Sequence, residues 1–292
     1  MPEYKCSVNP YALPRVGFGD GRSREFWKLV KGNRFLFRVQ DRRSKVKQLG
    51  DGGFLAAALR YPPATPQPSF DYESVMEHIR WDSRVKTPYI SASFSLAWAV
   101  WEADRRVGAN NRDVCIAVID GARIQSNAAE VALGILEEWG ATASSKNFAS
   151  ASQEVLIYAH VPADAVISIY GSEFIAANLP PWYNPLADFP ISNTSYTDFC
   201  EIEATRRHQK YRGKQRMAKF ALQLAQSTIP PDTPSKRWSK LAFGIGKHYI
   251  VWTMDPSQSS EEMDRTVKIV RQLSYLVKDE VKRRRYEERY AF

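Results

Sequence analysis

Short apolar segments between positions 35 and 170 constrain the fold more than any other feature of the sequence. Their alternation and their charged, glycine or proline borders predict strands at Phe35–Val39, Thr87–Ser95, Val114–Ile119, Glu154–Pro162 and Val166–Tyr170. Stretches with helical spacing of apolar residues separate them, at Asp71–Trp81, Leu96–Asp104 and Ala128–Trp139. This part of the chain is therefore predicted to be an α+β domain.

The chain changes character after Leu179, where four prolines between positions 180 and 190 indicate a linker. Long helices are predicted at Glu201–Gln226 and Asp264–Tyr290, whereas Leu241–Trp252 fits either a strand pair or a buried short helix. We predict three parts: an N-terminal arm (1–30), the α+β domain (31–180), and a basic, mainly helical C-terminal region packed on it (181–292).

The cysteines and the hydropathy pattern predict the compartment. Cys6, Cys115 and Cys200 are an odd number at wide spacing, which indicates neither a disulfide framework nor a zinc site and favours a reducing compartment. No apolar run approaches the length that crosses a bilayer, and the N-terminus is polar where a signal peptide is apolar. We expect a cytoplasmic or nuclear protein without membrane contact.

Positive charge is concentrated in the C-terminal region. Of the net charge of +9, the residues from Pro181 onward contribute +7, from 20 Lys and Arg against 13 Asp and Glu. The best candidate contact with nucleic acid or another acidic partner is a basic segment with an embedded tyrosine: Arg206, Arg207, Lys210, Arg212 and Lys214. A solvated helix face is the alternative.

Two further basic or metal-ligating patterns carry less information. Lys282–Arg285 fits a nuclear import signal, although cations are also favoured at a helix C-terminal end. The four histidines lack the paired spacing of a metal site, so no metal is predicted at His78, His160, His208 or His248.

Three short segments carry candidate chemistry. Arg38 lies near the end of the first predicted strand, Tyr89-Ile-Ser91-Ala-Ser93 precedes a helix, and Ser152-Gln-Glu154 opens a later strand. Together they resemble the ADP-ribosyltransferase fold family, which has an Arg on its first strand, an aromatic-x-Ser-Thr-Ser segment on a middle strand and a Glu at the start of a later one. The segments are also similar to an uncharacterised fungal domain group assigned to this fold.

The resemblance covers residues from about 30 to 175 and implies a split mixed β-sheet core that takes NAD as a substrate, without a metal. It implies that Glu154 is the catalytic carboxylate and that Arg38, Tyr89, Ser91 and Ser93 hold NAD. Cleavage between nicotinamide and ribose passes through an oxocarbenium-like state, which a carboxylate beside the sugar stabilises. A guanidinium binds phosphate or ribose oxygens in a bidentate manner, through two N–H groups.

The sequence departs from this pattern at two positions. Ala92 replaces the usual Thr, and Ser152 stands where many transferases place the Glu or Gln that engages the acceptor, so the acceptor stays open. Each match also has a simpler interpretation. Arg38 fits a structural ion pair, Ser93 or Ser95 fits the N-cap of the helix predicted from Leu96, and Glu154 fits a solvated carboxylate at a strand end.

Two functional hypotheses therefore stand. The first is an NAD-consuming ADP-ribosyltransferase or NAD glycohydrolase. The alternative is a catalytically degenerate module of the same fold that binds nucleic acid or a protein partner through its basic C-terminal region.

Overall fold

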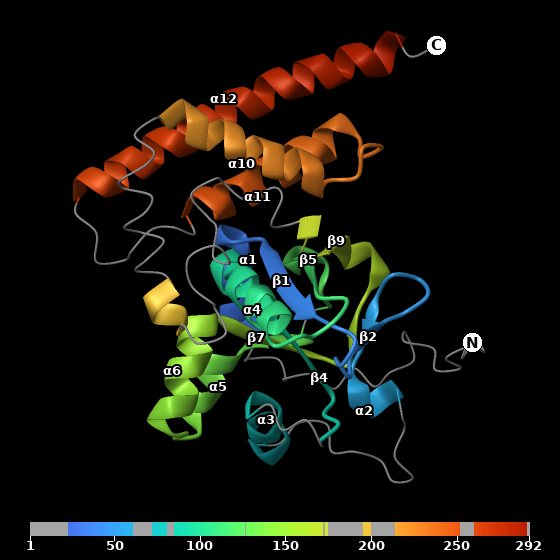
Figure 1. Cartoon of the computed structure of the whole chain (residues 1–292), viewed down its shortest axis with the longest axis vertical. Helices are drawn as coiled ribbons and strands as arrows, with labels where there is room; N and C mark the ends of the chain where they lie inside the picture. The colour runs from blue at the N-terminus through green and yellow to red at the C-terminus, as the bar shows by residue number, and fades with distance from the viewer. Residues whose placement is uncertain are drawn as a thin grey trace. The chain divides into compact units, whose positions relative to one another are not determined.

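The computed structural model describes residues 23–60, 72–80, 85–125, 127–171, 173–174, 195–199, 214–251 and 260–290. The described chain is a mixed α+β structure, as the sequence predicts (Figure 1). Six strands form one sheet in the order β6 (Ala129–Val131), β7 (Glu154–Tyr158), β4 (Tyr89–Ser93), β1 (Phe35–Gln40), β5 (Cys115–Asp120) and β9 (Val166–Gly171). A smaller sheet has the order β2 (Lys47–Gln48), β3 (Phe54–Leu55) and β8 (His160–Val161).

The described helices account for most of the other described residues. They are α1 (Ser23–Gly32), α2 (Ala57–Arg60), α3 (Tyr72–Ile79), α4 (Leu96–Gly108), α5 (Ala132–Glu138), α6 (Ala143–Ser152), α10 (Lys214–Thr228), α11 (Ser235–Val251) and α12 (Ser260–Tyr290). By its contacts the chain divides into two compact units. The first consists of residues 1–38, 43–94 and 119–166, and the second consists of residues 39–42, 95–118 and 167–292.

The antiparallel pairing of β4 with β7 organises the first unit. Ser91 lies opposite Leu156 and Ser93 lies opposite Glu154, so all four side chains emerge from the same face of the sheet. On this face, Leu156 and Tyr89 pack against buried residues of two helices, Val75, Met76 and Ile79 of α3 and Ala132, Ile135 and Leu136 of α5. This apolar cluster fixes the positions of α3 and β7, both of which contribute to the site described below.

Helices dominate the second unit. Helix α4 begins where the Ser95 hydroxyl accepts a hydrogen bond from the Trp98 amide, so Ser95, one of the two serines expected as N-cap, is the cap. Helices α10, α11 and α12 lie side by side and each packs on the other two (Figure 1). Gly246 of α11 permits this approach, because a Cβ there would lie 2.8 Å from the Leu273 side chain of α12.

Several elements differ from the sequence-based expectation. Ser23–Gly32 forms helix α1, with Phe26 and Val30 buried, and most of this helix lies within the segment 1–30 that was expected to be an arm. The predicted helix 128–139 is a short strand followed by α5, and Leu241–Trp252, for which two interpretations were open, lies almost entirely within α11. The helix expected at 201–226 is described only from Lys214, because residues 200–213 lie outside the described part.

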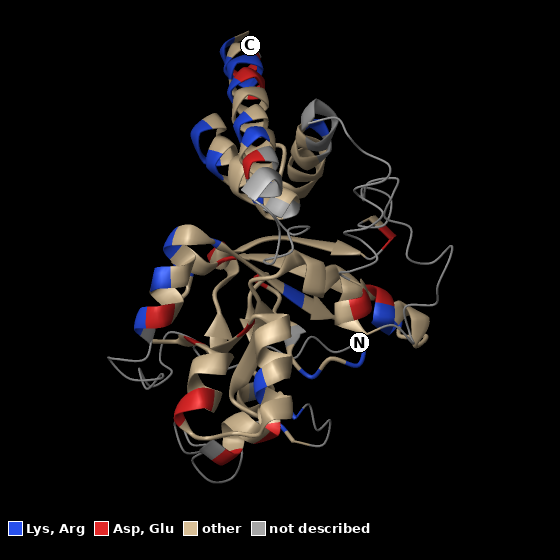
Figure 2. Cartoon of the chain, turned by 90° about the vertical axis from the view of Figure 1, so that its left-hand side faces the viewer, with Lys and Arg blue, Asp and Glu red and all other residues tan. Residues whose placement is uncertain are grey.

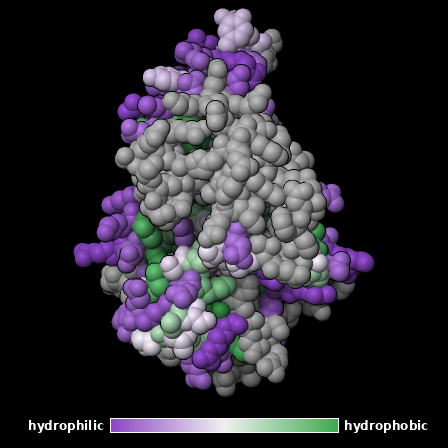
Figure 3. Space-filling view, turned by 60° about the vertical axis from the view of Figure 1, so that its left-hand side comes forward, coloured by the Kyte–Doolittle hydropathy of each residue, from purple (hydrophilic) through white to green (hydrophobic). Residues whose placement is uncertain are grey.

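The basic run near the C-terminus lies inside α12, where acidic and basic residues are interspersed (Figure 2). Lys282, Arg283 and Arg284 each form an ion pair within the helix, with Asp279, Glu280 or Glu287 as partners. In the face shown in Figure 3 this helical end carries mainly hydrophilic side chains. Within the described residues, no helix has the length and apolar character needed to cross a membrane.

Candidate functional site

Ser91 and Glu154 form the centre of the candidate site. The Ser91 hydroxyl donates to Glu154 Oε1 at 2.7 Å, across the β4–β7 pairing. Helix α6 ends at Ser152 and is capped by Gln153, whose left-handed φ of 48° returns the chain into strand β7. The Gln153 carbonyl then accepts from the Phe94 amide, which fixes Glu154 as the first residue of the strand.

Arg38 reaches the same site from β1. Its Nη1 donates to the Ser91 carbonyl oxygen at 2.7 Å, and its guanidinium lies 5.7 Å from the centre of the Phe54 ring. Arg38 is 7 % exposed. The structure therefore brings together Arg38, Ser91 and Glu154, which the sequence placed on three separate segments.

His78 of α3 completes the site, and sequence reasoning missed it. Its Nε2 lies 2.7 Å from the Ser91 hydroxyl, and its Nδ1 lies 2.5 Å from the Thr87 hydroxyl. Burial, and secondarily the positive charge of Arg38, lowers the pKa of His78 to about 3, so the imidazole is neutral. No spacing in the sequence signals this role, because the contact depends on how α3 packs on β4.

Burial also dominates the ionisation of Glu154. Its side chain is 3 % exposed, and desolvation raises its pKa to about 7 against the opposing effect of the Ser91 hydrogen bond. Among the described residues Glu154 Oε2 has no hydrogen-bond partner. The carboxyl group therefore titrates near neutral pH and keeps one oxygen with acceptor capacity.

Tyr89 and Ser93 lie beside this group, with their polar atoms bonded inside the protein. Tyr89 is fully buried and its hydroxyl lies 3.1 Å from Ser74 Oγ, while Ser93 donates to the Ser152 carbonyl oxygen at 2.5 Å. Both residues support the sheet and the α6–β7 junction. Their contact with NAD stays a prediction.

Ser152 does not belong to a strand, contrary to the sequence-based interpretation. It is the last residue of α6, and its hydroxyl donates to the Phe148 carbonyl oxygen at 2.8 Å. Gln153 is the cap of that helix. The strand therefore begins only at Glu154.

The basic contact expected in the C-terminal region lies mostly outside the described part of the chain. This applies to Arg206, Arg207, Lys210 and Arg212, and for Lys214 only its place at the start of α10 is described. Where the structure describes the chain, no group of three or more His, Cys, Asp or Glu side chains is arranged to hold a metal ion.

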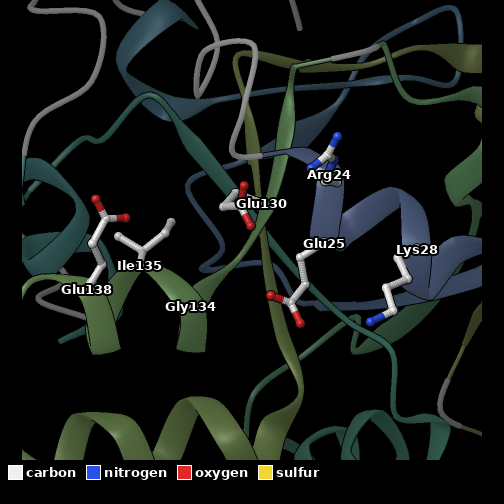
Figure 4. A pocket seen from close by; sticks show the side chains of 7 residues that line it. All are labelled: Arg24, Glu25, Lys28, Glu130, Gly134, Ile135 and Glu138. Atoms are coloured by element: carbon white, nitrogen blue, oxygen red, sulfur yellow. The ribbon is translucent and has the colours of Figure 1, made fainter.

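A cavity of about 420 Å³ lies elsewhere in the first unit. Figure 4 shows its lining side chains, from α1, β6 and α5: Arg24, Glu25, Lys28, Glu130, Gly134, Ile135 and Glu138. Glu130 lies opposite Leu156 and therefore shares a sheet face with Glu154, two positions along β7. None of the four residues of the candidate site lines this cavity.

The arrangement favours stabilisation of positive charge over nucleophilic attack by serine. In a nucleophilic triad the histidine Nδ1 is oriented by a carboxylate, whereas here Nδ1 contacts the Thr87 hydroxyl and the Ser91 hydroxyl points at Glu154. What remains is a desolvated carboxylate held by the Ser91 hydroxyl, with a guanidinium bonded to the backbone carbonyl oxygen of the same serine. Such a group suits a sugar or a developing cation.

Comparison with known protein families finds a match over the part of the chain that contains this site. Residues 31–174 match the family model described as Domain of unknown function (DUF7587). The match contains Arg38, His78, Ser91 and Glu154. No curated protein and no solved structure matches the chain.

Proposed function

We propose that this chain cleaves the bond between nicotinamide and ribose in NAD, as an ADP-ribosyltransferase or an NAD glycohydrolase whose acceptor is open. The observation that supports this most is the meeting of Arg38, Ser91 and Glu154. Two hydrogen bonds of 2.7 Å link these residues, one from Arg38 to the Ser91 carbonyl and one from the Ser91 hydroxyl to Glu154. The three residues come from adjacent strands in the order β7-β4-β1.

Glu154 supplies the central chemistry of this proposal. Its carboxylate would stabilise the positive charge that develops on the ribose as nicotinamide leaves, and Oε2 would accept a hydrogen bond from a ribose hydroxyl. Because the site is desolvated, this charge interaction is stronger than in water. The cationic nicotinamide ring would also favour the ionised form of a carboxyl group whose pKa is about 7.

Arg38 and Ser91 support the same step. The guanidinium offers several donors in one plane, which suits the diphosphate or ribose oxygens of NAD. Ser91 directs its proton at Glu154 Oε1, so it fixes the carboxylate in place. On this proposal, the six-stranded sheet is the split mixed core of an ADP-ribosyltransferase-like fold.

The proposal is tested by incubating purified protein with NAD and measuring the released nicotinamide by chromatography. We expect Glu154→Gln to abolish release while the thermal transition stays cooperative. Glu130→Gln is the matched control, because Glu130 is also a buried glutamate, 5 % exposed, on the neighbouring strand. Wild-type protein that neither binds nor cleaves NAD would refute the proposal.

The burial of Arg38 and Glu154 favours a second candidate function. In this alternative the chain keeps the fold without the activity, and binds nucleic acid or an acidic protein through its basic C-terminal region. Affinity for DNA or RNA would then fall steeply with salt, and neutral substitutions at Arg206, Arg207, Lys210 and Lys214 would abolish it. Absence of binding at low salt would exclude this candidate.

A further inference from the structure

We infer that His78 is a positioning residue that holds the Ser91 hydroxyl against Glu154; this inference rests on the proposed function. Four side chains form one continuous chain of hydrogen bonds. Thr87 Oγ1 contacts His78 Nδ1, His78 Nε2 contacts Ser91 Oγ at 2.7 Å, and Ser91 Oγ contacts Glu154 Oε1 at 2.7 Å. The imidazole is therefore the link between α3 and the reacting carboxylate.

The number of protons on these side chains determines which atom donates in each hydrogen bond. A serine hydroxyl has one proton, so a Ser91 that donates to the Glu154 carboxylate must accept from His78 Nε2–H. A neutral imidazole with a proton on Nε2 has none on Nδ1, which then accepts from the Thr87 hydroxyl. The direction of each hydrogen bond thus determines the direction of the next, and the Ser91 hydroxyl donates to the Glu154 carboxylate.

The same chain reverses when Glu154 takes up a proton. A protonated Glu154 Oε1 donates to Ser91, Ser91 donates to His78 Nε2, and His78 Nδ1–H donates to Thr87. Imidazole is suited to this exchange because it stays neutral in both directions and only its tautomer changes. The tautomer of His78 therefore reports the ionisation state of Glu154.

The surroundings keep His78 neutral and in place. Its ring contacts the Tyr89 ring edge to face, with centroids 5.7 Å apart, and the charge of Arg38 disfavours an imidazolium ion. On β4, β6 and β7, the other titratable side chains on the Glu154 side of the sheet are Glu130 of β6 and the tyrosines Tyr89 and Tyr158 of β4 and β7. None of these takes part in the hydrogen-bonded chain.

Substitutions of His78 separate positioning from packing. In His78→Gln the amide nitrogen can take the place of Nε2 and donate to Ser91, whereas in His78→Asn the shorter amide reaches only the place of Nδ1, next to Thr87. We expect His78→Gln to keep most of the nicotinamide release. We expect kcat to fall about tenfold in His78→Asn and His78→Phe, with little change in KM. In both variants Ser91, which bonds to Glu154, loses its hydrogen bond from position 78. His160→Phe is the matched control, since His160 of β8 is another partly buried histidine of the same unit.

A second measurement does not depend on activity. The nitrogen chemical shifts of His78 in ¹⁵N-labelled wild-type protein should show a change of tautomer across pH 7 without formation of imidazolium. In Glu154→Gln, where the carboxyl group is absent, the tautomer should not change.

The outcomes distinguish the two proposals. If the wild type releases nicotinamide and His78→Asn is as active as His78→Gln, the role of His78 is refuted and the proposed function stands. If the wild type releases none, the proposed function is refuted, and the tautomer change in wild type but not in Glu154→Gln still supports the role of His78. Nitrogen shifts that stay constant across pH 7, or that change equally in both proteins, overturn it.

Discussion

Replacing the buried carboxyl group of Glu154 by an amide should make the protein more stable at alkaline pH, even though the variant is expected to be inactive. Burial raises the pKa of Glu154 from the ordinary value of 4.5 to about 7. Between these values the folded state binds a proton that the unfolded state has released. The stability of the wild type therefore falls as pH rises through this window.

The size of the effect follows from the same shift. A pKa raised from 4.5 to about 7 corresponds to a loss of about 3 kcal/mol of folding free energy between pH 4 and pH 8. The amide of the Glu154→Gln variant cannot ionise, so this variant does not lose that folding free energy. The difference in unfolding free energy, variant minus wild type, should therefore increase by about 3 kcal/mol over that range.

Urea denaturation of both proteins at pH 4, 6 and 8 measures this difference. The contributions of the other titrating groups cancel in it, because both proteins contain those groups. Glu137→Gln serves as control, because Glu137 of α5 is exposed and its carboxyl group stays in contact with water. A difference between Glu154→Gln and wild type that is constant from pH 4 to pH 8 would refute the assignment of a desolvated carboxyl group. An equal gain of stability in the Glu137→Gln control would also refute this assignment.

Three other substitutions test the packing and the site. Gly246→Ala should destabilise the α10–α12 helices by about 1–3 kcal/mol in thermal unfolding, because the new Cβ would lie 2.8 Å from Leu273 Cδ2. Glu102→Gln should cost about 1–2 kcal/mol in urea denaturation, since Glu102 is 1 % exposed and forms hydrogen-bonded ion pairs with two arginines. Arg38→Lys should lower nicotinamide release at least about tenfold without loss of cooperative unfolding, because an ammonium cannot copy the planar fork of donors; full activity would contradict the role of Arg38.

The apolar periodicity was sufficient to locate several elements. The segments Phe35–Val39 and Val114–Ile119 correspond closely to β1 and β5, and the N-cap of α4 is Ser95, one of the two serines expected. These features depend on neighbouring residues alone, such as alternation of side chains and a hydroxyl before a helix. The end of α6 could not be predicted in this way, because Gln153 adopts a left-handed conformation that its residue type does not announce.

The residue types of the candidate site were visible in the sequence, since an arginine, a serine and a glutamate could be selected from the ends of predicted strands. Their meeting depends on the β7-β4-β1 strand order and on the register that sets Ser93 opposite Glu154, and both arise from contacts between distant segments. His78 was decided by tertiary structure alone. Its chemistry comes from being buried on Ser91 by the packing of α3, and a histidine exposed to water at the same position in the chain would be an ordinary titrating side chain.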